Sequence, residues 1–184
     1  MQVFCQLTFS WCTCDYIPFF RNLQSINSSL LFRLILLNKL LEDGNMLFRQ
    51  GQLADAAHRY RYALKRVPQH EDEDLSAQFD QIQLHLLLNL SRCQRRGGQY
   101  HEAARTASNA LSVHPTCVEG LVARAKAHQG AGKTKDALFD FYHALELAPN
   151  SKEIRKAIGK LREEVGIENH LSHASLGSSE SLEN

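Results

Sequence analysis

One spacing of glycine, alanine, aromatic and proline residues constrains the fold of this 184-residue chain more than any other feature. It occurs three times, with a glycine at the start of each copy and a proline at its end, and Ala107 replaces the aromatic residue in the second copy. The copies are Gly51, Ala56, Tyr60, Ala63, Pro68; Gly98, Ala103, Ala107, Ala110, Pro115; and Gly132, Ala137, Phe141, Ala144, Pro149. The second and third copies are offset by 34 residues at all five positions. A fixed period of this length indicates a stack of structural repeats.

Each kind of residue in this spacing has a physical role. The glycine falls between two helical patterns, where a tight turn between helices requires a positive φ angle. The alanines fall where two helices cross closely, because a larger side chain would hold the backbones apart. The proline ends the second helix and lets the next unit begin. The sequence therefore predicts two antiparallel helices in each unit.

This unit resembles the tetratricopeptide repeat (TPR), a helix pair of 34 residues. The resemblance implies an all-α fold, a right-handed α-α superhelix of three helix pairs with a C-terminal capping helix. It also implies a protein-binding module rather than an enzyme. We expect an N-terminal apolar segment at 1–36, partly helical or poorly ordered, repeats at 37–70, 84–117 and 118–151, a capping helix at 152–168 and a disordered tail at 169–184.

The second repeat is predicted to have a lengthened first helix. Pro68 and Pro115 are 47 residues apart, 13 more than the period of the other repeats. Residues 71–74 are all acidic, and after them Phe79 and Ile82 continue a helical spacing of apolar residues. We interpret the acidic run as the solvated N-terminal end of this helix, which its dipole favours. A metal or partner site is the alternative.

Helices are also expected at both ends of the repeats. The apolar run 30–37 is too short to span a bilayer and continues with helical periodicity, which favours a helix that docks on the repeats and ends near Leu41. After Pro149, the apolar residues Ile154, Ile158 and Leu161 share one helix face, as a terminal capping helix requires. Seven or eight helices are therefore predicted in total.

Composition and charge exclude several classes of partner. With 21 basic and 20 acidic residues the formal charge is +1, so the chain is not a polycation that binds nucleic acid. Five cysteines without paired spacing indicate reduced thiols and a cytoplasmic location. We expect no nucleic acid, no membrane insertion and a protein or peptide partner. Self-association through the N-terminal apolar segment is a further expectation.

The sequence does not predict catalysis, a metal or a cofactor. Cys12 and Cys14 lack the second half of a zinc site, and the nine histidines are scattered. Residues 132–134 resemble the last residues of a nucleotide-binding loop, but Ala127 occupies the position where that loop requires an upstream glycine. Cys93 falls on the packed side of a helix, which favours a small buried residue over a reactive thiol.

The expected binding surface follows from the family resemblance. In TPR stacks the first helix of each pair lines a concave groove. On that pattern the groove contains Asn45 and Arg49 from the first repeat, Asn89, Arg92 and Arg96 from the second, and Lys126 from the third, with Glu119 and Val122. So many cations on one surface of a nearly neutral chain predict an acidic partner peptide. An ordinary solvated helix face is the alternative.

One known ligand of such modules is the acidic C-terminus of cytosolic heat-shock chaperones. Modules that resemble those of co-chaperones hold the terminal carboxylates of this ligand with two asparagines and three cations. This chain keeps the asparagines as Asn45 and Asn89, but Leu41, Glu119 and Ala123 replace the cations. Losing these charges should remove most of the electrostatic affinity. Co-chaperone-type binding is therefore the alternative to a general acidic-peptide scaffold.

Three stretches look like the repeat region of the TANC/rolling pebbles scaffolds, which combine ankyrin and tetratricopeptide repeats. They are 56–64, 86–93 and 123–126, within a similarity that covers about 40–165. This resemblance implies a cytoplasmic adaptor protein. Because no ankyrin repeat accompanies the stretches, the chain would be a fragment or short product of such a gene.

Overall fold

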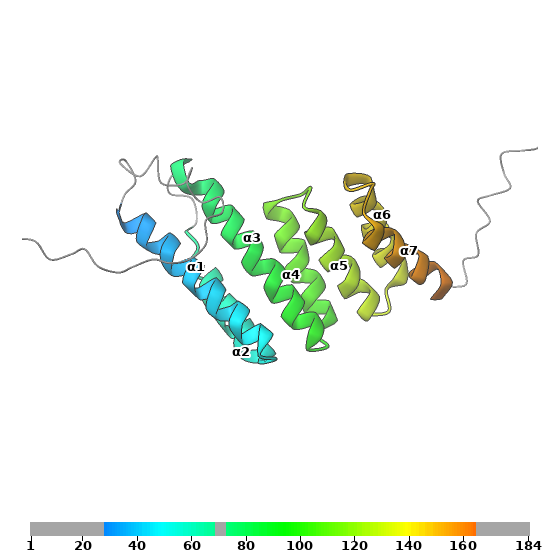
Figure 1. Cartoon of the computed structure of the whole chain (residues 1–184), viewed down its shortest axis with the longest axis horizontal. Coiled ribbons are helices and arrows are strands. Elements are labelled where there is room, and N and C mark those ends of the chain that lie inside the picture. Colours follow the sequence, from blue (N-terminus) through cyan, green and yellow to red (C-terminus); the bar gives the residue numbers. More distant parts are fainter. Residues whose placement is uncertain (1–27, 69–72, 165–184) are drawn as a thin grey trace, which may run out of the picture.

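The computed structural model describes residues 28–68 and 73–164, which form seven helices arranged in series along the molecule (Figure 1). The helices are α1 (Ser28–Arg49), α2 (Leu53–Leu64), α3 (Glu73–Arg96), α4 (Tyr100–Val113), α5 (Val118–Gly130), α6 (Thr134–Leu147) and α7 (Lys152–Glu164). No strand occurs among these residues. The predicted all-α fold is confirmed for the described part of the chain.

The helices form three antiparallel pairs that stack on one another. α1 packs against α2, α3 against α4 and α5 against α6. The second helix of each pair also packs against the next helix along the chain, and α7 packs against α6. In addition, α3 contacts both α1 and α5, so the first helices of the pairs are neighbours. This is the arrangement of three pairs and a cap that the repeat predicts.

The turn within each pair has the glycine geometry expected from the sequence. Gly51 has a φ of 80°, and the equivalent Gly98 and Gly132 have φ angles of 77° and 73°. At the first turn, the backbone N–H of Gln52 donates to the carbonyl of Leu47 at 3.0 Å. This hydrogen bond closes the end of the helix and requires the positive φ angle of the glycine. A residue with a β-carbon adopts that φ angle only under strain.

Small residues are buried wherever two helices cross. The alanines of the repeat have no exposed surface, and these are Ala56, Ala63, Ala103, Ala107, Ala110, Ala137 and Ala144. The aromatic position of the spacing is also buried, since Tyr60 and Phe141 are each 1% exposed. Alanine at these crossings lets the helix backbones approach closely, and the two aromatic rings pack into the hydrophobic clusters of the core.

The lengthened helix of the second repeat is present as α3, which has 24 residues. Phe79, Ile82 and Leu86 are buried along one side of it, as the apolar spacing predicts. The helix begins at Glu73, within the acidic run, and residues 71 and 72 lie outside the described residues. The inserted residues therefore make α3 longer than the first helix of a standard repeat.

The predicted boundary between residues 36 and 37 lies inside α1, so the part of the N-terminal segment that is described is helical. The expected separate helix ending near Leu41 does not occur, and α1 is one continuous helix of 22 residues. The physical reason is an unbroken apolar stripe, in which Leu30, Leu34 and Leu37 are all buried against the other helices. Residues 1–27 lie outside the described residues.

The helix α7 lies at the end of the stack, where the capping helix was predicted. Ile154, Ile158 and Leu161 are buried against α6 and its neighbours, whereas Lys156 and Lys160 are exposed. The remainder of the predicted cap, 165–168, and the tail at 169–184 lie outside the described residues. Within the part of the chain that is described, no helix combines the length and hydrophobicity needed to cross a membrane.

Larger side chains at the helix crossings should destabilise the fold. We predict that Ala110→Leu and Ala144→Leu each lower the free energy of unfolding by about 1–3 kcal/mol, because both alanines are fully buried. Urea unfolding measures this change. Ala77→Leu, at an exposed position of α3, is the matched control and should change stability by less than about 0.5 kcal/mol. Unchanged stability in both buried variants would contradict the packing described above.

Candidate peptide-binding groove

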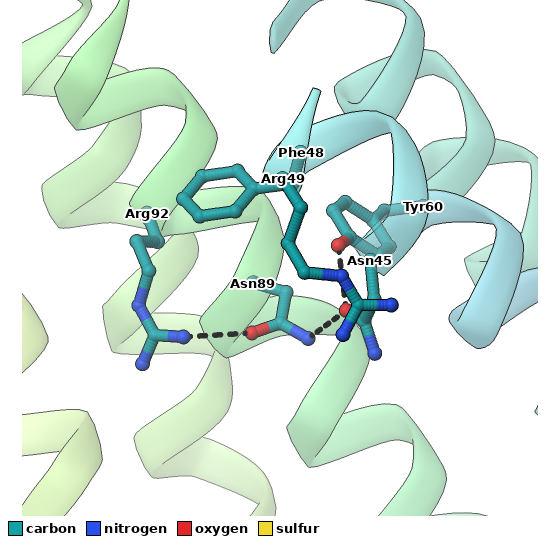
Figure 2. A pocket seen from close by; sticks show the side chains of 6 residues that line it. All are labelled: Asn45, Phe48, Arg49, Tyr60, Asn89 and Arg92. Atoms are coloured by element: carbon teal, nitrogen blue, oxygen red, sulfur yellow. Dashed lines mark hydrogen bonds between the residues drawn. The ribbon is translucent and has the colours of Figure 1, made fainter. Parts of the chain in front are cut away.

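A pocket of about 270 Å³ lies where α1, α2 and α3 meet (Figure 2). Four of the predicted groove residues line it, and these are Asn45, Arg49, Asn89 and Arg92. Sequence reasoning missed the other two lining residues, Phe48 and Tyr60. The pocket therefore combines two amides and two guanidinium groups with an aromatic ring on either side.

A chain of hydrogen bonds fixes the polar groups of the pocket (Figure 2). The Tyr60 hydroxyl donates to Asn45 Oδ1 at 2.8 Å, and Asn89 Nδ2 donates to the same oxygen at 2.9 Å. Arg92 Nη1 in turn donates to Asn89 Oδ1 at 3.2 Å. The carboxamide oxygens of both asparagines thus already accept hydrogen bonds. Asn45 Oδ1 accepts two hydrogen bonds and Asn89 Oδ1 accepts one. Most of the hydrogen-bonding capacity that remains belongs to the guanidinium and amide donors, which favours a ligand group that accepts hydrogen bonds.

The local sequence explains how this network forms. Gly44 precedes Asn45 on α1 and is buried, and a β-carbon at residue 44 would overlap the ring of Tyr60. Glycine there lets the Tyr60 ring lie directly against the α1 backbone, so its hydroxyl reaches Asn45. In the sequence, Gly44 was the one signal that could have predicted Tyr60 as a residue of the pocket. The contact between Gly44 and the Tyr60 ring is seen only in the structure.

The pocket has a strong local excess of positive charge. Among the described residues, Arg49, Arg92 and Arg96 form no ion pair with a carboxylate. The pKa of Arg95 is lowered by burial and then by the positive charges of Arg96 and Arg92. Cations that repel a neighbouring arginine in this way gain energy when an anion binds between them.

The two other predicted groove cations lie differently. Arg96 does not line the pocket, but its guanidinium lies 4.5 Å from the centre of the Phe48 ring, which is a cation–π contact beside it. Lys126 is exposed on α5 and does not line the pocket. Glu119 is exposed in the first turn of α5 and Val122 is half-buried. The cations are therefore concentrated on α1 and α3.

The arginine of α5 is engaged elsewhere. Arg124 follows the position where the chaperone-binding pattern requires a cation, but its Nε and Nη2 donate to the Asp140 carboxylate at 2.9 and 2.6 Å. Asp140 is 2% exposed, and His128 Nε2 lies 3.8 Å from it. This ion pair joins the partly exposed Arg124 of α5 to the buried Asp140 of α6. Arg124 is thus committed to folding and does not replace the cation missing at Ala123.

The described residues do not assemble a reactive site at this groove. Cys93 is 2% exposed, and burial raises its pKa to about 11, so the thiol stays protonated and unreactive near neutral pH. No group of three potential metal ligands lies together in residues 28–68 and 73–164. Cys12 and Cys14 fall outside those ranges.

The chain is similar to several known proteins, although no family model matches it. The DnaJ homolog subfamily C member 7 homolog of Schizosaccharomyces pombe is 32% identical over 122 residues, which is 66% of this chain and 24% of that protein. Outer envelope protein 61 of Arabidopsis thaliana is 29% identical over 132 residues, 70% of this chain and 23% of that protein. The chain thus spans about a quarter of the length of these relatives.

Solved structures share the fold. The C-terminal TPR-containing domain of a putative FK506-binding protein of Plasmodium falciparum has a TM-score of 0.66 at 23% identity and covers 73% of this chain and 91% of that one. The first TPR of Spaghetti (RPAP3), bound to the HSP90 peptide SRMEEVD, has a TM-score of 0.59 at 20% identity, with coverages of 71% and 93%. The chain therefore has the fold of a tetratricopeptide-repeat domain.

Removing the Tyr60 hydroxyl should change how stability depends on pH. Burial raises the pKa of Tyr60 from 10.0 to about 12, so between these values the unfolded protein loses the proton first. The stability contribution of Tyr60 is complete below pH 10 and should fall by up to about 1.4 kcal/mol per pH unit above it. Tyr60→Phe should lack this loss, although it costs about 1 kcal/mol at pH 7.

Urea unfolding of both proteins at pH 8, 10 and 11 measures this effect. The stability difference between the parent protein and Tyr60→Phe should shrink as pH rises above 10. A difference that stays constant over this range would show that the Tyr60 hydroxyl is not held protonated by burial.

Proposed function

We propose that this chain is a non-enzymatic protein-protein interaction module that binds an acidic partner segment at the pocket between α1 and α3. The observation that carries the proposal is the composition of that pocket. Both amide oxygens already accept internal hydrogen bonds, two at Asn45 and one at Asn89, and its two arginines have no carboxylate partner among the described residues. Such a lining favours carboxylate or other anionic groups through charge-assisted hydrogen bonds.

The structural relatives support an acidic partner. In one of them the ligand is the HSP90 peptide SRMEEVD, which contains three acidic residues. Its fold matches this chain over 71% of the length, which supports a peptide-binding groove of the same kind here. The chemistry of that ligand agrees with the arginines found here, although the residues that would bind it differ between the two types of module.

A co-chaperone-type module that holds a terminal carboxylate is the second candidate. Asn45 and Asn89 favour it, because they occupy the positions of the two asparagines in that pattern and contact each other. Leu41, Glu119 and Ala123 oppose it, and no other cation of α5 lines the pocket. We therefore favour an acidic segment anchored on α1 and α3 over a terminal carboxylate held by all three repeats.

For the whole protein we propose the role of a cytoplasmic scaffold or adaptor. The likeness of three stretches to the TANC/rolling pebbles repeats supports this role, and the TPR fold is compatible with it. Cysteines without paired spacing favour a reducing compartment. The matched part of the DnaJ homolog covers only 24% of that protein, so its other functions are not carried over.

Reversing the charge of the groove should abolish partner binding. Arg92 and Arg96 lie four residues apart on α3, and both are exposed. We predict that the double variant Arg92→Glu, Arg96→Glu loses at least about 100-fold in affinity for an acidic peptide, because like charges repel at the groove. Melting temperature should change little, since exposed charges contribute little to folding. Fluorescence anisotropy with a labelled glutamate-rich peptide measures the affinity.

The control variant is Arg105→Glu on α4. Arg105 is exposed and paired with Glu102, away from the pocket. It should leave peptide binding unchanged, and binding by the parent protein should weaken as salt screens the attraction over about 8–10 Å. Unchanged affinity in the Arg92 and Arg96 double variant would show that the groove is not the site.

Self-association through the N-terminal part of the chain is also part of this proposal. Phe32 and Ile35 are 67% and 60% exposed on the outer side of α1, and Met46 is 48% exposed further along the same side. Lys39 and Glu42 are exposed between them. Two copies packed antiparallel through α1 could pair each Lys39 with the Glu42 of the other copy, while the apolar residues cover one another.

Sedimentation equilibrium tests self-association directly. We expect the parent protein to dimerise at micromolar concentration and the double variant Phe32→Ser, Ile35→Ser to be monomeric. Phe139→Ser is the matched control, because Phe139 is 70% exposed on α6. A parent protein that stays monomeric at about 100 μM, where a useful dimer interface should be populated, would contradict the proposal.

A further inference from the structure

The pocket offers more hydrogen-bond donors than one carboxylate can accept. Its lining residues include Asn45, Arg49 and Arg92, which carry an amide nitrogen and two guanidinium groups. Each guanidinium carries five N–H donors, and Arg92 uses one of its nitrogens on Asn89. A carboxylate has two oxygens, with about four acceptor positions between them. A phosphate monoester presents three strongly accepting oxygens, so it can satisfy more of these donors.

The charge of the pocket also exceeds that of one carboxylate. Arg49 and Arg92 supply two positive charges at the lining, and Arg96 supplies a third beside it on the Phe48 ring. None of the three forms an ion pair with a carboxylate in the described part of the chain. One carboxylate would leave at least one lining arginine uncompensated. A phosphate group, with a charge of about −1.5 to −2 at neutral pH, matches both.

The size of the pocket suits a single side chain. Its volume of about 270 Å³ is below the roughly 300–1,000 Å³ typical of sites for whole small molecules. The lining comes from α1, α2 and α3 alone, and neither Glu119 nor Lys126 of α5 takes part. An anion in this pocket would therefore lie at the junction of the first two repeats, and Glu119 of the third repeat would not face it.

We propose that this pocket binds a phosphorylated side chain of the acidic partner segment. The exposed side chains of Arg49 and Arg92 lie on opposite sides of the Asn89–Asn45 pair and turn toward the phosphate oxygens when it binds, and the amide nitrogen of Asn45 donates a further hydrogen bond (Figure 2). Tyr60 and Asn89 hold the Asn45 carboxamide so that its oxygen points away from the ligand. This inference rests on the proposed function, because it specifies the group that the groove recognises. Partner binding would then be controlled by phosphorylation of the partner.

Four labelled peptides test this preference on the full chain by fluorescence anisotropy. They share one acidic octapeptide sequence and differ only at its centre. The first three carry serine, glutamate or phosphoserine there. The fourth carries two adjacent glutamates, which match the charge of the phosphopeptide. We expect the phosphoserine peptide to bind about tenfold more tightly than either glutamate peptide, as one further charge-assisted hydrogen bond would give. Equal affinity for the phosphoserine and double-glutamate peptides overturns the inference.

Conservative variants locate the preference. Arg49→Gln and Arg92→Gln should each reduce it to below about threefold, whereas Arg105→Gln on α4 should keep it. If all acidic peptides bind equally and the charge-reversed groove loses them all, the interaction module stands and the phosphate site is wrong. If none of the four peptides binds the parent protein, both proposals are wrong.

Discussion

The structure depends on the close approach of helices at positions where the side chain is small. Ala56, Ala110 and Ala144 have no exposed surface, and each sits at a crossing that a larger residue would force apart. The same constraint applies at Gly44, whose missing β-carbon leaves room for the Tyr60 ring. Helix packing and the geometry of the candidate site therefore have one cause. If the first pair separated, the Tyr60 hydroxyl would no longer reach Asn45.

The arginines can remain without carboxylate partners because of where they stand on the helices. Arg49 is the last residue of α1, and Arg95 and Arg96 are the last residues of α3. Cations interact favourably with the negative end of the helix dipole by about 0.3–1 kcal/mol, which offsets part of their mutual repulsion. The cation–π contact between Arg96 and Phe48 helps in the same way. Their charge therefore remains available to a ligand.

Sequence could predict the stack but only part of the site. Spacing sufficed for the turns and helix crossings, because glycine and alanine have few alternative roles at such positions. It did not predict where α1 begins, because the apolar stripe of that helix runs through the expected boundary after residue 36. Of the predicted groove residues, Lys126 lies outside the pocket, because a helical repeat places residues on a face without fixing how deep a recess extends. Phe48 and Tyr60 were not predicted, because only the packing of α1, α2 and α3 shows that they line the pocket.

The most direct test of an anion-binding groove on α1 and α3 is a heteronuclear NMR titration of the isotope-labelled chain with an acidic peptide. The side-chain amide signals of Asn45 and Asn89 report on the pocket itself. The largest shift changes are predicted there and at the backbone amides of Arg49 and Arg92, and they should disappear at high salt. Changes centred instead on the exposed face of α6, around Phe139 and Tyr142, would contradict it.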